Sequence, residues 1–442
     1  MAKGQIWETR PLEFWNLAKE LRAGWQKSIE SVEKVVGQGS TGDLKCDWTA
    51  AFPALTLIED NPVGAMMQNK NEPYARKARL ASEVRGWGRE ICGYQGNCWG
   101  GQFLGYIEDG TPWPKRKLVV PMPDVCDQHG KRGQQARDFE NMPQWMSDRF
   151  AYTGPFDEVR NEVFIEHKVY CNLKVLNDIE RIFGQQCDDA ELLNLMEKSD
   201  MVKEYALEIS ALMARTIPTP LSVKDLYSVY TIGGLTKIDP DATVNFWKTV
   251  RDEVKWRAEN HIAAVGNERF RWVEAHPPSW HFMKYYRYME QYGAVCMGSE
   301  YSHLMSGGVM ELKPDGSVGL RETLNYPEGT IASTREDAVR LAAGYDARLP
   351  VGFKMAEYID PDCIVDFAKL FQADGALLAI WRHGVGCTLT RKEQGMNLKK
   401  AGLNVIHYEG SQPGDRTDLD EKRLLDQLDN WMQSLGYQKQ AP

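Results

Sequence analysis

The chain has 442 residues, a formal net charge of −9, and apolar and charged fractions of 43% and 26%, which are ordinary for a soluble globular protein. This length exceeds what one hydrophobic core holds and predicts two or three domains. The acidic balance argues against nucleic-acid binding, and the lack of an apolar run of about eighteen residues argues against a membrane helix.

The N-terminus lacks the apolar stretch of a signal peptide, so we expect a cytoplasmic protein. The nine cysteines of such a chain are then reduced thiols or metal ligands rather than a disulfide framework.

An apolar stripe at helical spacing predicts a helix over residues 11–36 that stops at Gly37. The following stretch, 37–42, matches the pattern GxGxxG. A dinucleotide fingerprint follows a strand and opens a helix, whereas this one follows the predicted helix and precedes the strand-like 44–48. We therefore do not expect a nucleotide site here.

The remaining elements predict an α/β fold with two Rossmann-like or flavodoxin-like parallel-sheet domains and a helical domain. We assign 1–39 to an N-terminal helical segment, 40–155 to a first α/β domain, 156–265 to a mainly helical domain and 266–442 to a second α/β domain. Strands are predicted at 117–125, 270–275, 294–297, 376–381 and 404–408. Helices are predicted at 157–183, 189–215, 223–233, 241–264, 281–292, 361–371, 392–401 and 420–436.

Three cysteines leave regular elements beside glycines. Cys126 ends the strand-like KLVVPMPDV, Cys387 follows ALLAIW through a short turn, and Cys92 lies in the glycine-rich ICGYQGNCWGG. Ligands bind outside the carboxyl ends of strands in open α/β sheets, and thiolates there suit an iron–sulfur or other soft metal site. Cys98 is an alternative or fourth ligand.

Cysteine is also a common small core residue, and each of these thiols on its own fits that interpretation too. We expect core packing for Cys171, Cys187, Cys296 and Cys363, while Cys46 is ambiguous.

Titratable and aromatic groups crowd the same loops and predict a pocket there. From their positions at strand ends, His383, His129 and Glu300 are candidate proton donors, although a satisfied loop histidine is an equal alternative for His383. The segment 70–89 carries six Lys and Arg residues, which suit either an anionic ligand or partner, or a solvated helix face. The chain contains no GxxxxGK[ST], GxSxG, HExxH or CxxC motif.

With these residues in view, the chain resembles the 2-hydroxyacyl-CoA dehydratase and benzoyl-CoA reductase family from about residue 44 to 437. The resemblance lies in SEVRGWGREICGYQGNCW, VVPMPDVCD, VEAHPPSWHFMKYYRYMEQYGAVCMGSEY, QADGALLAIWRHGVGC and HYEGSQPGDRTDLDEKRLLDQLDNWM. It implies that Cys92, Cys126 and Cys387 bind a [4Fe–4S] cluster whose fourth iron position is open or holds a small ligand.

Within the family, the length and the GSQPGDRTDLDEKR stretch look most like the larger cluster-binding subunit, of the B or O type, of ATP-dependent class I benzoyl-CoA reductase. That resemblance implies a homologous cluster-binding subunit, two ATPase or activator-type subunits that hold the ATP, ferredoxin as electron donor and an aryl-CoA substrate. The implied reaction is two-electron reduction of the aromatic ring to a cyclic dienoyl-CoA.

Two alternatives remain open. The first is a subunit of a 2-hydroxyacyl-CoA dehydratase, which uses a ketyl radical without net reduction. Dehydratase subunits often carry a Pro-x-Glu-Leu element, whereas Phe52-Pro53-Ala54-Leu55 has no glutamate at that place, which favours the reductase branch. The second is an electron-relay subunit whose sister subunit binds the substrate.

Overall fold

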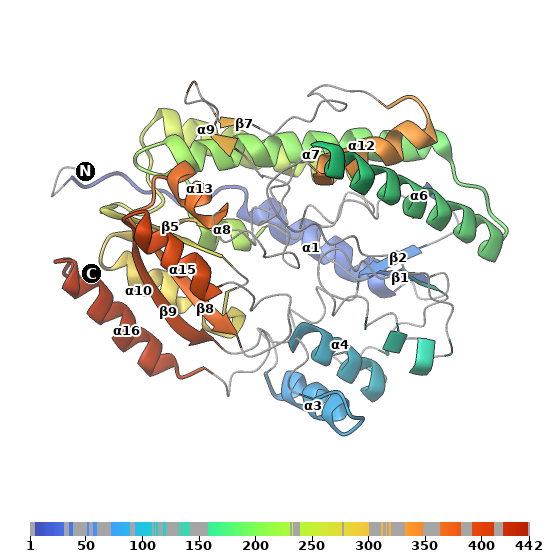
Figure 1. The fold of residues 1–442 in the computed structure, drawn as a ribbon, viewed down its shortest axis with the longest axis horizontal. Helices are drawn as coiled ribbons and strands as arrows, with labels where there is room; N and C mark the ends of the chain where they lie inside the picture. Colours follow the sequence, from blue (N-terminus) through green and yellow to red (C-terminus); the bar gives the residue numbers. More distant parts are fainter. Residues whose placement is uncertain are drawn as a thin grey trace.

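The structure is a computed structural model of the chain. It describes residues 5–30, 35–38, 51–52, 56–59, 72–88, 93–107, 110, 112–113, 118–120, 131, 134–135, 137–139, 141, 158–229, 232, 239–275, 278–299, 311–312, 315, 318–319, 332–347, 363–381, 391–410 and 419–440. The fold is mixed α/β, as expected, and Figure 1 shows two separate parallel sheets below long helices.

The larger sheet has four parallel strands in the order β5-β4-β8-β9. The chain runs from β4 outward to β5 and then returns to the other side of β4, which is the beginning of the flavodoxin-like order. Every residue of β4 and β5 is buried, and such continuous burial is typical of parallel sheets covered on both faces. These strands are β4 (Phe270–Glu274), β5 (Ala294–Ser299), β8 (Gly375–Trp381) and β9 (Asn404–Gly410).

Helices alternate with the strands of this sheet along the chain, as predicted. The predicted helix at 281–292 is a 3-10 turn, η3 (Trp280–Phe282), followed by α10 (Lys284–Glu290). The others are α13 (Cys363–Leu370), α15 (Arg391–Lys400) and α16 (Glu421–Ser434), each within two or three residues of its predicted ends. The side chain of Asp420 accepts a hydrogen bond from the backbone N–H of Arg423, 2.9 Å away, and caps α16.

The smaller sheet has three parallel strands in the order β2-β1-β3. They are β1 (Val35–Gln38), β2 (Thr56–Glu59) and β3 (Leu118–Val120). The prediction of one helix over 11–36 was wrong at its end, because α1 covers Trp15–Glu30 and Val35 begins a strand. The β-branched pair Val35 and Val36 continues the helical stripe by coincidence of spacing, and pairing with two distant strands decides its structure.

The strand β1 also changes the context of the GxGxxG match, because Gly37 and Gln38 lie within β1 rather than after a helix. The rest of that match, and the strand-like 44–48, lie outside the described residues.

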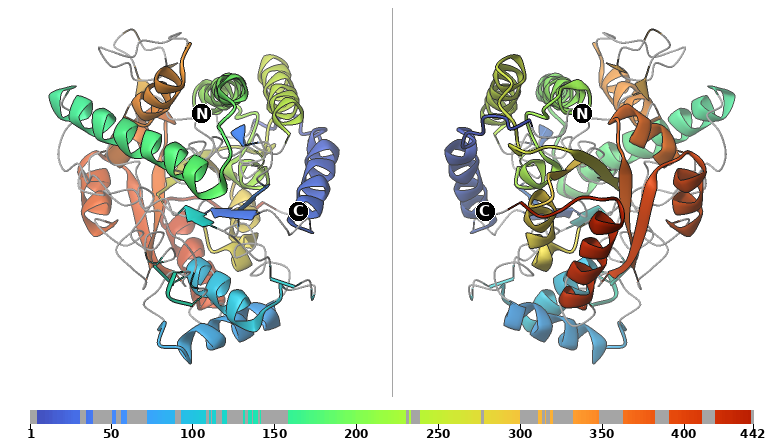
Figure 2. Two further views of the ribbon diagram at one scale, coloured as in Figure 1. Left: turned by 90° about the vertical axis from the view of Figure 1, so that its right-hand side faces the viewer. Right: turned by 90° about the vertical axis from the view of Figure 1, so that its left-hand side faces the viewer.

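Long helices form the layer that joins the two sheets. The predicted helices at 157–183 and 189–215 are confirmed as α6 (Glu158–Phe183) and α7 (Asp189–Arg215). The helix α8 (Val223–Tyr227) is shorter than predicted, and α9 (Pro240–Glu259) ends before residue 264. Figure 2 looks along α7, with α9 beside it and α1 beside α9, and α12 (Arg335–Ala347) packs on α6.

The helices α3 (Glu72–Glu83) and α4 (Gly93–Leu104) pack closely through glycines. A Cβ atom on Gly100 would lie 1.8 Å from the backbone oxygen of Ala78, and the Ser82 hydroxyl donates to the Gly96 carbonyl at 2.7 Å. In the basic segment, Arg76 pairs with Glu72 one turn away at 2.6 Å, which supports the solvated-face interpretation there, whereas Arg79 is buried against α4.

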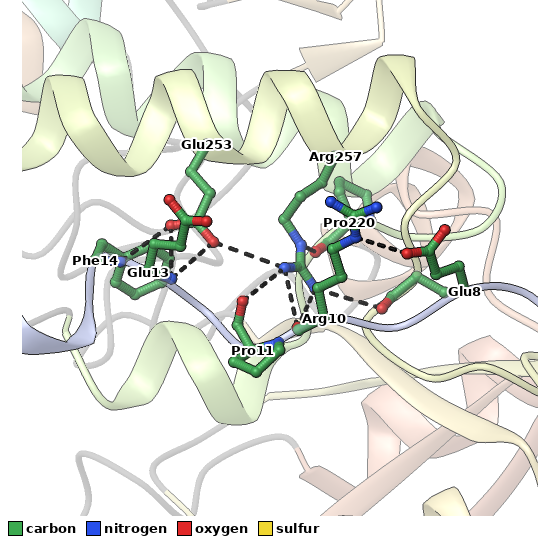
Figure 3. Close-up of polar contacts among 9 residues, drawn as sticks. Glu8, Arg10, Pro11, Glu13, Phe14, Pro220, Glu253 and Arg257 are labelled. Carbon is green, nitrogen blue, oxygen red and sulfur yellow. Dashed lines mark hydrogen bonds and ion pairs between the residues drawn. The ribbon is translucent and has the colours of Figure 1, made fainter.

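Two charged side chains of α9, Arg257 and Glu253, bind the N-terminal segment through hydrogen bonds to its backbone (Figure 3). The Arg257 guanidinium is 3% exposed and donates to the carbonyls of Arg10 and Pro220 at 3.1 and 3.0 Å. The Glu253 carboxylate accepts hydrogen bonds from the backbone N–H groups of Glu13 and Phe14, both at 3.0 Å, just before α1. The antiparallel pair β6 (Glu311–Leu312) and β7 (Val318–Gly319), which contacts α13 and α7, completes the described elements.

None of the helices that the structure describes has the length and apolarity needed to cross a membrane.

Candidate functional site

Two cysteines follow strands of the two parallel sheets at equivalent distances in the sequence. In each sheet the first strand lies between the second and third, so the order reverses at the boundary between the first and third strands. Ligands of open α/β sheets bind at the carboxyl ends of the strands at such a switch point. Cys126 follows the end of β3 by six residues, and Cys387 follows the end of β8 by six residues.

Cys92 directly precedes the first residue of α4, Gly93. A helix N-terminus carries a partial positive charge, which stabilises a neighbouring thiolate. Cys92, Cys126 and Cys387 themselves lie outside the described residues, as do His129, Glu300 and His383.

The alternative ligand Cys98 lies within α4 and is 1% exposed, in the hydrophobic core. Within the part of the chain that the structure describes, no group of three or more His, Cys, Asp or Glu side chains is placed to hold a metal ion.

Three of the cysteines predicted to be core residues are confirmed as such. Cys171, Cys187 and Cys296 are all buried. Burial raises the pKa of the Cys187 thiol to about 12 and raises the pKa of Cys296 well above its ordinary value, so both remain neutral thiols. Cys363 is the first residue of α13, and Cys46 lies outside the described residues.

A buried carboxyl group at the carboxyl end of β4 is the strongest polar feature of the larger sheet. Glu274 Oε1 accepts hydrogen bonds from Tyr227 at 2.7 Å and Tyr286 at 2.6 Å, and Oε2 accepts one from Tyr285 at 3.1 Å. Ser299, the last residue of β5, hydrogen-bonds to Glu274 and lies 2.6 Å from the Tyr227 hydroxyl. We call these five residues the Glu274 cluster.

Burial governs the charge of this cluster. Desolvation raises the pKa of Glu274 to about 7, against the lowering effect of the hydroxyl groups of Tyr286, Tyr227, Tyr285 and Ser299. Burial and the neighbouring Glu274 carboxyl also raise the pKa of all three tyrosines well above its ordinary value. The cluster therefore holds one group that exchanges a proton near neutral pH, surrounded by hydroxyls that stay protonated.

Our sequence reasoning missed Glu274. The residues of the Glu274 cluster come from α8, β4, α10 and β5, so their proximity depends on the tertiary fold. The available signal was a carboxylate at the end of the apolar strand FRWVE, since a buried charge needs several partners, together with the adjacent Tyr285 and Tyr286.

Two cavities in the described part of the molecule lie away from the strand ends. One, of about 550 Å³, lies between the N-terminal segment and α9, beside Arg10, Glu253 and Trp256. The other, of about 540 Å³, lies between β9 and α16, beside His407 and Trp431. Neither includes the Glu274 cluster.

Comparison with known families gives one match. The family described as 2-hydroxyglutaryl-CoA dehydratase, D-component, matches residues 81–428, a span that contains Cys92, Cys126 and Cys387. No curated protein matches the chain. Because the match covers more than half of the chain, the protein belongs to the 2-hydroxyglutaryl-CoA dehydratase D-component family, whose members are subunits of dehydratase- or reductase-type enzymes that act on CoA thioesters by radical chemistry.

Proposed function

We propose that the chain is the iron–sulfur subunit of an ATP-dependent aryl-CoA reductase. In this proposal the enzyme reduces the ring of benzoyl-CoA or a close analogue to a cyclohexadienoyl-CoA, with electrons that pass from ferredoxin through partner ATPase subunits. The observation that carries the proposal is the family match over 81–428, together with the sequence positions of Cys126 and Cys387, each six residues after the third strand of a parallel sheet.

The donor set suits a [4Fe–4S] cluster. Cys92, Cys126 and Cys387 would supply three thiolates, which are the ligands that iron–sulfur clusters take, and would leave one iron without a cysteine. The position of Cys92 before the N-terminus of α4 favours both its thiolate form and a negatively charged group beside it. When bound, the cluster would supply single low-potential electrons to an acyl-CoA thioester.

The protein's own residues would keep the site dry and deliver protons. Every residue of β4 and β5 is buried, as are residues 376–379 of β8, and exclusion of water protects reactive intermediates. The candidate proton donors are Glu300, His383 and His129, which follow β5, β8 and β3 in the sequence, and two-electron reduction of a ring takes up two protons.

A specific observation favours a second candidate, a 2-hydroxyacyl-CoA dehydratase subunit, because the matching family is described by a dehydratase component. Against it, the sequence lacks a glutamate in the stretch 52–55, and the length and the segment 410–423 resemble reductase subunits. The two reactions differ in electron balance, so assay separates them. Reduction consumes electrons and ATP in every turnover, whereas dehydration is redox-neutral.

The first experiment tests the ligands. In the anaerobically purified complex with its partner subunits, C92S, C126S and C387S should each lose iron and acid-labile sulfide, while C171S should retain both. C98S should also retain both, because Cys98 is buried in the hydrophobic core. Full iron content in the three single variants would overturn the ligand assignment.

The second experiment tests the reaction. Wild-type complex supplied with reduced ferredoxin, ATP and benzoyl-CoA should form a dienoyl-CoA with ATP consumed in proportion to product. Release of an enoyl-CoA from a 2-hydroxyacyl-CoA, with ATP needed only in trace amount, would support the dehydratase instead. Binding of acyl-CoA solely to the sister subunit would support an electron-relay role.

A further inference from the structure

We propose that Glu274 stores a proton and passes it to Ser299 at the carboxyl end of β5, and so supplies a proton to the acyl-CoA bound beyond the strand ends. This inference rests on the proposed function, because the acceptor is the reduced acyl-CoA. It assigns Glu274 as a proton store that does not touch the substrate, and Ser299 as the group that passes the proton to the acceptor.

The geometry gives the proton a path. Ser299 hydrogen-bonds to Glu274, and the Tyr227 hydroxyl bridges the two residues at 2.7 Å from Glu274 Oε1 and 2.6 Å from Ser299 Oγ. Ser299 is the last residue of β5, and Glu274 is the last residue of β4, so the path runs along the edge at which ligands of such sheets bind.

The remaining tyrosines stabilise the ionised form. When the proton leaves, the Glu274 carboxylate still accepts hydrogen bonds from Tyr285 and Tyr286. Tyr286 is itself held by stacking on Trp272, with ring centroids 5.6 Å apart. Hydrogen bonds to a charged group are stronger than those to a neutral one, so these donors lower the cost of leaving a charge in the core.

The transfer balances in protons and electrons. The O–H bond of the Glu274 carboxyl breaks, an O–H bond forms at Ser299 Oγ, and the proton that Ser299 held passes to the acceptor, which has gained an electron from the reductive machinery. The proton can also travel through Tyr227, which takes up the Glu274 proton and gives its own proton to Ser299, so that one more O–H bond breaks and one more forms. Glu274 is left as carboxylate and, being buried, regains a proton by the reverse path through Ser299 between turnovers.

The surroundings agree with this role. The groups that face Glu274 are Tyr227 from α8, Tyr285 and Tyr286 from α10, Cys296 and Ser299 from β5, and Tyr408 from β9. Burial raises the pKa of every one of these thiol and phenol groups, so none competes for the charge near neutral pH. The pKa of Glu274, about 7, lets it hold a proton and release it at that pH.

The test uses E274Q and S299A in the complete complex, with iron content and thermal midpoint measured alongside. Each variant should lower kcat about 10- to 100-fold, the range of a lost proton-transfer group, with KM unchanged within about twofold. In wild type we expect activity to fall as the pH rises through about 7, because Glu274 then ionises, and each variant should lack this fall.

Y292F is the matched control. Tyr292 is likewise a buried tyrosine that donates to a carboxylate, Asp429, at 2.6 Å, but it does not contact the Glu274 cluster. It should keep the wild-type pH profile. Y285F removes one donor to the Glu274 carboxylate and should shift the alkaline limb of the profile to higher pH.

Infrared spectra of substrate-free protein separate this inference from the proposed function. Wild type should show a protonated carboxylic acid band at pH 6 that weakens at pH 8, and E274Q should lack it. If the band is absent, or if S299A retains wild-type kcat at full iron content, the relay is overturned while acyl-CoA turnover stands. If wild type turns over no acyl-CoA, the proposed function fails and the relay fails with it, even though the band remains.

Discussion

At the scale of single residues, Glu274 shows a balance between burial and hydrogen bonding. Four hydroxyl groups contact one carboxyl, yet burial still raises its pKa from 4.5 to about 7. Such perturbed groups at the ends of strands are common at functional sites. The same shift has a consequence for stability that can be measured without substrate.

The folded protein should lose stability as the pH rises from about 4.5 to about 7. In this window the unfolded chain ionises Glu274 whereas the folded chain keeps its proton, so the unfolded state binds fewer protons. The full difference is about 3 kcal/mol, reached above pH 7. Denaturant unfolding of E274Q should show a shallower decrease than wild type, while the exposed control E393Q keeps the wild-type slope. Equal slopes in E274Q and wild type would contradict the assignment.

A second residue-scale prediction concerns Gly100. Its Cβ atom in G100A would lie 1.8 Å from the Ala78 carbonyl, and this backbone atom moves only if α3 and α4 separate. We expect a loss of about 3 kcal/mol, seen as faster hydrogen exchange in both helices. G110A is the control, because Gly110 has open space but a φ of +89°, so only backbone strain of about 1 kcal/mol applies. Equal effects of both substitutions would show that the two helices do not depend on this close approach.

At the scale of elements, local periodicity predicted most of the larger sheet and the long helices. The helical segments 189–215 and 420–436 carry their pattern and their caps in adjacent residues, such as Asp188, whose carboxylate accepts from the Glu191 N–H. The strand 404–408 likewise carries its apolar pattern in adjacent residues. The prediction of Val35 and Val36 as helical was wrong because a four-residue strand is too short to show its own period and its partner strands are distant in sequence. The Glu274 cluster could not be predicted for the same physical reason, since its residues come from four elements that are distant in sequence.

The attachment of the N-terminal segment to α9 yields the element-scale prediction. R257M removes the guanidinium that satisfies the carbonyls of Arg10, Pro220 and Ala263, and leaves Glu253 without its buried ion-pair partner. Unsatisfied buried groups are costly, so we expect about 3 kcal/mol of destabilisation and early proteolysis before α1. R251M on the same helix is the control, since Arg251 pairs with half-exposed carboxylates. Intact N-terminal protection in R257M would contradict the anchoring role.

At the scale of the whole molecule, the two parallel sheets repeat one arrangement. Both place the first strand between the second and the third, and in both the third strand leads to a cysteine six residues later. The residues alone suggested that two halves could share a site, but the shared strand order became visible only when β1 was found at the centre of its sheet. A metal centre bound by both cysteines would join parts of the chain that otherwise have separate sheets.

That connection predicts a non-additive loss of stability. If Cys126 and Cys387 bind one cluster, C126S alone releases the metal from both sheets, and C387S does the same. A structural metal contributes several kcal/mol, so each single variant should lower the anaerobic thermal midpoint by about 10 °C. The double variant C126S/C387S should fall no further, because contacts within one site are not additive. C187S, which changes a buried thiol in the helical layer, should leave the metal in place and add its own effect to either variant. Additive losses for C126S and C387S would instead show that the two cysteines act independently.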